Sequence, residues 1–443
     1  MQEFEPILNK VSDFVWSWPL IILLFGTHIY LTIRLKFIQR YIGRAIKISF
    51  SQKREGQGDI SQFGSLMTAL AATIGTGNIV GVSTAVALGG PGAVLWMWLT
   101  GVFGIATKYS EALLAVKYRI TDSDGTMAGG PMYVLERGMG QKWLAVIFAV
   151  FTAIAAFGIG NMVQANSISV LLNNTFHVAP WISGVVMTIL TAVVILGGIK
   201  SIARTCGALV PFMAVFYVVG CLVILAINYK AIPSSIMLIL NSAFTGQAAI
   251  GGFLGAGVKE TVRYGVARGL FSNESGLGSA PIVAAAAQTK TPARQGLVSS
   301  TGTFWDTVVV CALTGLVIIS SGDWTSGLSG PALTQSAFNA IPCIGPFVLT
   351  VGLLTFVFST ILGWSYYGEK AVEYLFGIRA VRPYRYVWIA AVMIGSVATM
   401  PAVWSFADIA NGLMAVPNLI ALIVLTPVIC RETKQYFNEN QTE

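Results

Sequence analysis

A run of glycines and an asparagine interrupts a hydrophobic segment that is long enough to cross a bilayer. The segment covers residues 62–88, and the run AATIGTGNIVG occupies residues 71–81 in its middle. Backbone N–H and C=O groups in lipid must be satisfied within the protein, which normally keeps a helix unbroken. A break is tolerated where the freed groups meet protein, water or a ligand, as in the binding sites of many transporters. Residues 71–81 are therefore the first candidate for a functional site.

The composition predicts an all-α polytopic membrane protein. Hydrophobic residues make up 55% of the chain and charged residues only 10%, whereas soluble domains carry about 25% charged residues. Windows of apolar residues predict about eleven spans. We expect them at residues 12–36, 62–88, 92–117, 143–171, 180–198, 206–228, 251–288, 296–320, 346–376, 384–402 and 405–429.

Basic residues set the expected orientation in the plasma (inner) membrane. The loop after the first span contains Arg34, Lys36, Arg40, Arg44, Lys47, Lys53 and Arg54. Because basic loops stay in the cytoplasm, the N-terminus is expected outside and, with an odd number of spans, the C-terminus inside. This asymmetry accounts for the net charge of +8 without a nucleic-acid partner.

A second break follows five spans after the first. The run FSNESGLGSAP at residues 271–281 interrupts the predicted seventh span. An odd separation gives the two halves opposite topology, and breaks at corresponding positions of inverted halves point to a transporter site. The expected units are an extra N-terminal span with a basic loop, two five-helix repeats and a cytoplasmic tail. Their boundaries are 1–60, 61–230, 231–430 and 431–443.

Other functional classes fit the sequence poorly. The two histidines, His28 and His177, are expected near loops or outer ends, and the five cysteines form no CxxC pair. No HExxH motif or nucleophile elbow is found, so we expect neither an enzyme nor a cofactor. A channel usually shows rings from identical subunits or hydrophobic constrictions, and two different breaks argue against one.

A series of motifs covers essentially the whole chain. They are GTGNIVG (75–81), GGPG (89–92), WMW (96–98), ATK (106–108), AGGPMY (128–133), GIGNMVQ (158–164), FSNESGLGSAP (271–281) and GWSYYGEK (363–370). In this order they resemble the alanine-or-glycine:cation symporter family. The resemblance implies a leucine-transporter-like fold of two inverted five-helix repeats. It also implies uptake of alanine or glycine driven by Na⁺, the only metal ion expected.

The first break suits the carboxylate of an amino acid. Free N–H groups at a half-helix N-terminus carry a partial positive charge, and Gly75 and Gly77 let the backbone approach closely. We expect Thr76 and Gly77 to contact the carboxylate through their N–H groups. The alternative is that Gly77 and Gly81, spaced as a small-xxx-small motif, serve only helix packing.

Carbonyl and hydroxyl oxygens predict a cation site beside the first break. The side-chain oxygen of Asn78 is a hard ligand for Na⁺, and its alternative is an interhelical hydrogen bond. The resemblance adds the carbonyls of Ala71 and Ile74 and the hydroxyls of Ser359 and Thr360. Such hydroxyls often bond back to their own helix instead.

Two further helices are expected to face the substrate. Asn161 and Gln164 share one face of the span 143–171, and Gln164 can hold a charged group of the substrate or bond to another helix. Trp364 lies one turn after Thr360, where it would restrict the pocket to alanine or glycine. The alternative for this tryptophan is an interfacial or lipid-facing position.

The second break supplies further substrate candidates and a buried acid. The substrate candidates are Phe271, Ser272, Asn273 and Gly276. A carboxylate at membrane depth is costly and is a functional hypothesis by default. Glu274 can therefore be a cation or ammonium ligand, a proton carrier, or a partner of Arg268.

Other charged residues are assigned by their positions in the predicted spans. Asp306, near the middle of the eighth span, is a second possible coupling acid, so proton coupling is the close rival of Na⁺ coupling. Lys108, Glu111 and Arg119 are expected at the inner end of the third span as a gate or salt-bridge set. Asp408 is expected close to the outer surface.

Overall fold

A computed structural model describes residues 5–51, 56–245, 257–339, 341–342, 344–398 and 401–439. The described chain is helical apart from one antiparallel pair of short strands, β1 (Ile120–Thr121) and β2 (Met127–Ala128). The first half contains α1 (Glu5–Val15), α2 (Trp18–Arg34), η1 (Ile38–Tyr41), α3 (Ile42–Ser49), α4 (Gln62–Thr73), η2 (Gly77–Gly81), α5 (Val82–Gly89), α6 (Ala93–Lys117), α7 (Pro131–Tyr133), η3 (Val134–Gly138), α8 (Lys142–Phe157), η4 (Gly158–Met162), α9 (Val163–Phe176), α10 (Pro180–Ile195) and α11 (Gly198–Ile227).

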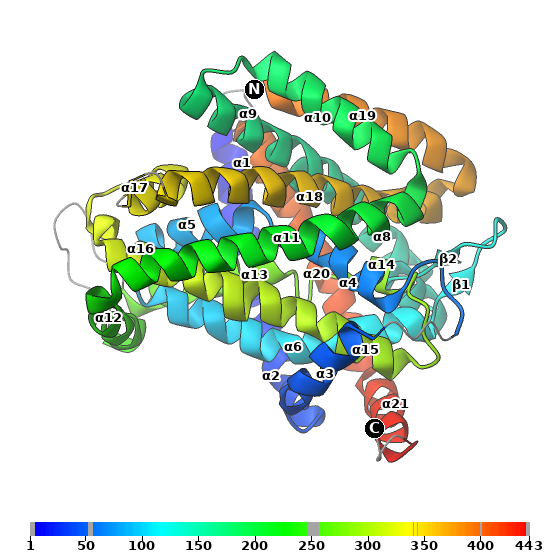
Figure 1. Ribbon diagram of the computed structural model, residues 1–443. Coiled ribbons are helices and arrows are strands. Elements are labelled where there is room, and N and C mark those ends of the chain that lie inside the picture. The colour runs from blue at the N-terminus through cyan, green and yellow to red at the C-terminus, as the bar shows by residue number, and fades with distance from the viewer. Residues whose placement is uncertain are drawn as a thin grey trace.

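The second half is also helical. It contains η5 (Tyr229–Ala231), α12 (Ile232–Thr245), α13 (Val258–Asn273), α14 (Pro281–Ala284), α15 (Pro292–Thr303), η6 (Phe304–Cys311), α16 (Ala312–Ser321), η7 (Asp323–Thr325), α17 (Gly330–Asn339), α18 (Ile344–Phe376), η8 (Ile378–Ala380), α19 (Val381–Val397), α20 (Pro401–Val424) and α21 (Thr426–Glu439). In Figure 1, α11 runs beside α18 and α10 runs beside α19, so segments from the two halves are packed together.

The described helices include six that are long and apolar enough to cross a membrane, or seven if the bent pair α4 and α5 forms one span. The chain is therefore a multi-pass membrane protein. The other predicted spans coincide with shorter or more polar helices, among them α6, α10, α13 and α19, so the count of about eleven stays a prediction. Residues 251–256 of the predicted seventh span lie outside the described residues.

Both helix breaks lie where the glycine-rich runs predict them. α4 ends at Thr73 because Ile74 adopts an extended conformation, and the chain restarts at Gly77 with a bend of 52°. α13 ends at Asn273, and the following chain turns through Glu274, which has a left-handed φ of 55°.

Besides η3, the described residues contain three further π-helical turns. They are η2 in the first break, η4 between α8 and α9, and η6 between α15 and α16. Such turns occur frequently at functional sites because they leave backbone groups outside the regular hydrogen-bond ladder. The sequence predicted an interruption only at the first of these three places.

Candidate functional site

The Asp306 carboxylate joins the two breaks. Asp306 lies in η6 and is fully buried. Its Oδ1 accepts a hydrogen bond from Asn78 Nδ2 of the first break at 2.7 Å, and its Oδ2 accepts one from the Ser272 hydroxyl of the second break at 3.0 Å. The Thr307 hydroxyl donates to the same Oδ2 at 2.6 Å. A carboxylate and two hydroxyls thus meet where the halves of the molecule meet.

Both polar atoms of the Asn78 side chain form hydrogen bonds within the protein. Its Oδ1 accepts a hydrogen bond from the Gly75 N–H at 2.9 Å, while its Nδ2 donates to Asp306 and to Cys311 Sγ. The interhelical hydrogen bond named as the alternative is therefore present, and Oδ1, the oxygen expected to bind the cation, accepts the Gly75 N–H.

The structure brings together the other four residues of the predicted cation site. The Ser359 hydroxyl donates to the Ala71 carbonyl at 3.2 Å, and the Thr360 hydroxyl donates to the Ile74 carbonyl at 3.4 Å. Both hydroxyls also contact the carbonyl of Phe356 in their own helix, so the back-bonded alternative coexists with the contact across the break.

The Ala71 and Ile74 carbonyls are available for a simple reason. In a regular helix the N–H of Gly75 would donate to Ala71, but here that N–H donates to Asn78. Ile74 itself is extended, so its carbonyl leaves the helical direction. Carbonyls freed in this way are the oxygen ligands that broken transporter helices offer to Na⁺.

Two buried amides near the breaks each have one atom without a hydrogen-bond partner in the described part of the chain. Gln164 Nε2 donates to the Thr76 hydroxyl at 3.3 Å and to the Ile159 carbonyl at 3.0 Å, which leaves Oε1 without a donor. Asn273 Oδ1 accepts from the Ser275 N–H, which leaves Nδ2 without an acceptor. Buried polar atoms are seldom unpaired, so both atoms call for a partner.

Glu274 and Trp364 form a buried pair. Glu274 Oε1 accepts a hydrogen bond from Trp364 Nε1 at 3.0 Å, and its Oε2 accepts one from the Ser279 hydroxyl. The guanidinium of Arg268 lies 5.9 Å from the centre of the Phe271 ring and is not the partner of Glu274 among the described contacts. Trp364 is only 1% exposed, which rules out the lipid-facing alternative.

Glycines allow the elements of this centre to approach closely. A Cβ at Gly75 would lie 2.6 Å from Thr360 Oγ1, and a Cβ at Gly77 would lie 3.2 Å from the Cα of Ser272. Only a residue without a side chain fits at the first position without displacing its neighbour. Gly276, the remaining substrate candidate, has a left-handed φ of 90° in the second break.

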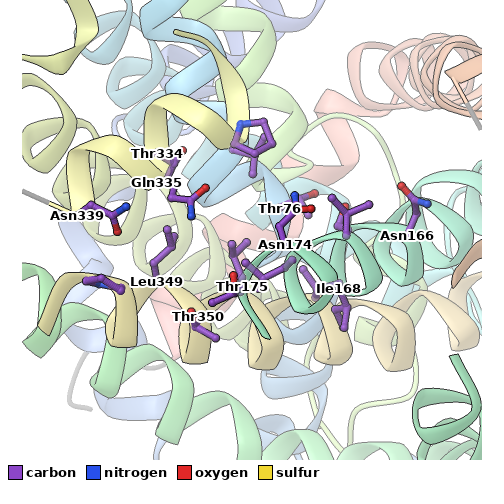
Figure 2. A pocket seen from close by; sticks show the side chains of 18 residues that line it. Thr76, Asn166, Ile168, Asn174, Thr175, Thr334, Gln335, Asn339, Leu349 and Thr350 are labelled. Carbon is purple, nitrogen blue, oxygen red and sulfur yellow. The ribbon is translucent and has the colours of Figure 1, made fainter. Parts of the chain in front are cut away.

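A cavity of about 240 Å³ leads to the first break. Thr76 and Val80 line it, together with residues of α9, α17 and α18. Figure 2 shows Gln335 and Asn339 of α17 facing Asn174 of α9 across this cavity. Its polar groups are amides and hydroxyls, and its lining residues carry no formal charge, which suits a molecule with no net charge.

A second cavity, of about 320 Å³, is lined by charged residues. Arg385 donates to both oxygens of Glu369 at 2.6 and 2.8 Å, and Lys370 Nζ lies 2.9 Å from both oxygens of Glu373. Asp59, in the loop before α4, also lines this cavity, and burial raises the pKa of its carboxyl group. The two cavities thus differ sharply in charge.

Comparison with known proteins places the chain in a family. The model of the sodium:alanine symporter family matches residues 1–443. The sodium/alanine symporter AgcS of Methanococcus maripaludis is 52% identical over 448 residues, which cover 99% of this chain and 98% of that protein. The chain belongs to the sodium:alanine symporter family. An uncharacterized transporter of Haemophilus influenzae is 53% identical over 438 residues, which cover 98% of this chain and 96% of the relative.

A solved structure shows the same fold at low identity. The crystal structure of MhsT in complex with L-phenylalanine superposes with a TM-score of 0.58 at 17% identity, covering 84% of this chain and 90% of that one. The leucine-transporter-like fold expected from the motifs is thereby supported at the level of the whole fold. Membership of the symporter family confirms an amino-acid transporter rather than an enzyme.

The structure corrects the position expected for His28. This residue is fully buried within α2 rather than near a loop or an outer end, and its Nδ1 lies 2.8 Å from the Thr107 hydroxyl of α6. The expectation failed because a hydropathy window does not show that α6 covers this face of α2.

Lys108 and Glu111 lie on α6 and Arg119 lies just beyond its end, and among the described residues the three form no salt bridge with one another. Arg119 donates to the carbonyls of Ala285 and Ala287 at 2.8 Å, and Lys108 Nζ has no hydrogen-bond partner within the described ranges. Glu111 Oε1 accepts hydrogen bonds from the N–H groups of Gly276 and Gly278 in the second break. Sequence spacing placed these residues on one helix but did not show what packs against it.

Proposed function

We propose that this family member is a sodium-coupled symporter that carries alanine or glycine into the cell by alternating access. The observation that carries the proposal is the meeting of the two helix breaks at Asp306. Carbonyl and hydroxyl oxygens that could bind Na⁺, and two amide atoms without hydrogen-bond partners among the described residues, lie at the same breaks. The name of AgcS, a sodium/alanine symporter 52% identical to this chain, supports the same ion and substrate.

The unpaired atoms match the two ends of an amino-acid zwitterion. Gln164 Oε1 is an acceptor and suits the ammonium group, whereas Asn273 Nδ2 is a donor and suits the carboxylate. The N–H groups of Thr76 and Gly77 would complete the carboxylate site. Buried Trp364, held by Glu274, would restrict the space left for the substrate side chain.

We propose that Na⁺ binds between the first break and α18. Its ligands would be the carbonyls of Ala71 and Ile74 and the hydroxyls of Ser359 and Thr360, which already converge. Cation binding would hold the bent α4 against α18 and so stabilise the pocket for the amino acid. The two inverted repeats, 61–230 and 231–430, would then rock about this centre, with the N-terminus outside and the C-terminus in the cytoplasm.

Proton coupling is the second candidate, and two buried carboxylates favour it. Glu274 and Asp306 each accept several hydrogen bonds at the junction of the breaks, where a proton would change the network. A relative of Bacillus subtilis, 35% identical to this chain, is named a putative sodium/proton-dependent alanine carrier protein. Na⁺ and H⁺ are therefore compared as coupling ions in the same assay.

The first prediction concerns the driving ion. In proteoliposomes, labelled alanine should accumulate when an inward Na⁺ gradient is imposed, and uptake should stop when Na⁺ is replaced by K⁺. A negative potential inside should increase accumulation, because moving one charge is worth roughly 2.3 kcal/mol per 100 mV. Uptake that continues on a proton gradient without Na⁺ would instead establish the proton-coupled alternative.

The second prediction concerns Gln164. Gln164→Leu removes the free acceptor and should raise the KM for alanine about tenfold, with the Na⁺ dependence of uptake unchanged. Ser169→Ala is the control on the same helix, α9, because the Ser169 hydroxyl forms a hydrogen bond with the Ser183 hydroxyl of α10 at 2.9 Å. That variant should lower thermal stability and leave KM unchanged. A Gln164→Leu variant with normal KM would refute the ammonium assignment.

A further inference from the structure

Glu111 of α6 holds the backbone of the second break from outside the proposed substrate site. Its Oε1 accepts hydrogen bonds from the N–H groups of Gly276 at 3.0 Å and Gly278 at 3.1 Å. Asn418 of α20 donates to the same oxygen at 2.7 Å and also to the Gly276 carbonyl at 2.9 Å. Two helices far apart in the sequence, α6 and α20, therefore form hydrogen bonds to one turn of the second break.

These hydrogen bonds replace the helical acceptors that the backbone loses where α13 ends. Beyond α13 the chain follows left-handed turns at Gly276 and Gly278, with φ of 90° and 89°, so their N–H groups cannot continue the helical ladder. Buried N–H groups need an acceptor, and a carboxylate is a strong one. Glu111 is 2% exposed, so water does not compete freely for these contacts.

The surrounding side chains leave the turn little freedom to choose another path. A Cβ at Gly276 would lie 2.8 Å from Leu24, and a Cβ at Gly278 would lie 2.7 Å from the Phe148 ring. The turn is thus packed against Leu24 and Phe148, and Glu111 Oε1 fixes its backbone. At the start of the same turn, Asn273 Oδ1 accepts the Ser275 N–H and Glu274 Oε1 accepts the Trp364 indole N–H.

We propose that Glu111 is a positioning residue. By accepting hydrogen bonds from the N–H groups of Gly276 and Gly278, it sets the path of residues 274–280 and thereby aims Asn273 and Glu274 at the substrate. Its role depends on the acceptor oxygen more than on the charge. The effect on the backbone follows from this geometry alone, whereas the expected effect on alanine affinity rests on the proposed function.

A rival role for Glu111 is also visible in the structure. Its Oε2 and the Nζ of Lys108, one turn earlier on α6, are both buried and have no hydrogen-bond partner among the described residues. Asp306, Glu274 and His28 interact electrostatically with the same lysine. If Glu111 served only as a counter-charge or proton carrier, replacing it by glutamine would be as damaging as removing its oxygens.

The test compares three variants of the full-length protein in lipid nanodiscs. Glu111→Gln keeps an acceptor without the charge, and Glu111→Met keeps similar length without an acceptor. Ser110→Ala is the matched control, because the buried Ser110 hydroxyl donates only to its own helix at the Ala106 carbonyl. Hydrogen–deuterium exchange of residues 274–280 is the substrate-independent measurement, with residues 71–81 as the internal reference.

Glu111→Met should speed exchange of residues 274–280 by about tenfold or more, because hydrogen bonds to a charged group are lost. Glu111→Gln should keep most of the protection, and Ser110→Ala should match the wild type. In uptake assays, Glu111→Met should raise the KM for alanine about tenfold, with a smaller change in the maximal rate.

Two results would overturn the proposal: unchanged exchange in Glu111→Met, or equal damage in Glu111→Gln and Glu111→Met. If Glu111→Met does not fold, the same exchange measurement is made on Asn418→Leu. This variant removes the hydrogen bonds of Asn418 to Glu111 and to the Gly276 carbonyl, and it should speed exchange of residues 274–280 selectively. If the wild type fails to take up alanine, the proposed function is wrong, but the exchange data still decide the role of Glu111.

Discussion

Asp306→Asn is expected to lower sodium-driven alanine uptake by about 100-fold, which corresponds to ~3 kcal/mol. The carboxylate accepts hydrogen bonds from Asn78, Ser272 and Thr307 at the junction of the two breaks. An asparagine offers one oxygen in place of two and turns an amide group toward existing donors. It also removes an acidic group from the junction of the two breaks.

Initial uptake rates in proteoliposomes, measured over a range of Na⁺ concentrations, test this expectation. Asp408→Asn is the matched control, because it makes the same substitution on α20, where the Asp408 backbone carbonyl accepts a hydrogen bond from the Trp16 indole. The control should transport normally. Wild-type rates and Na⁺ dependence in Asp306→Asn would show that the carboxylate is structural. Uptake by Asp306→Asn that persists only on a proton gradient would show that Asp306 is needed for Na⁺ coupling and not for proton coupling.

Local sequence predicts the breaks well because their causes are local. Glycines in an apolar segment weaken a helix locally, and α4 and α13 end within the two runs. The convergence of Ala71 and Ile74 with Ser359 and Thr360 was available only through the family resemblance. Nothing in the spacing of these residues relates one helix to the other.

Contacts across long stretches of chain could not be predicted. Glu111 and Gly276 are separated by 165 residues, and Asn78 and Asp306 by 228 residues. A polar side chain on a predicted helix has many possible neighbours, so the sequence did not indicate that Glu111 contacts the second break or that Asn78 contacts Asp306. In the structure both side chains accept hydrogen bonds from backbone N–H groups that a helix break had freed.

Gly75→Ala is expected to raise the Na⁺ concentration for half-maximal uptake roughly 30-fold, or ~2 kcal/mol, because overpacking displaces cation ligands. The added Cβ would lie 2.6 Å from Thr360 Oγ1, the hydroxyl that donates to the Ile74 carbonyl. Either Thr360 turns away or the backbone of the break shifts. Both movements separate a hydroxyl from a carbonyl within the proposed Na⁺ site.

Gly81→Ala in the same broken helix separates this steric effect from a general effect of alanine on the bend. A Cβ at Gly81 would have no neighbour within 4 Å, and Gly81 already has a helical φ of −63°. Its Na⁺ titration should match the wild type. If Gly75→Ala also titrates normally, Thr360 does not contribute to cation binding. If both variants fail equally, flexibility of the break matters more than the fit between Gly75 and α18.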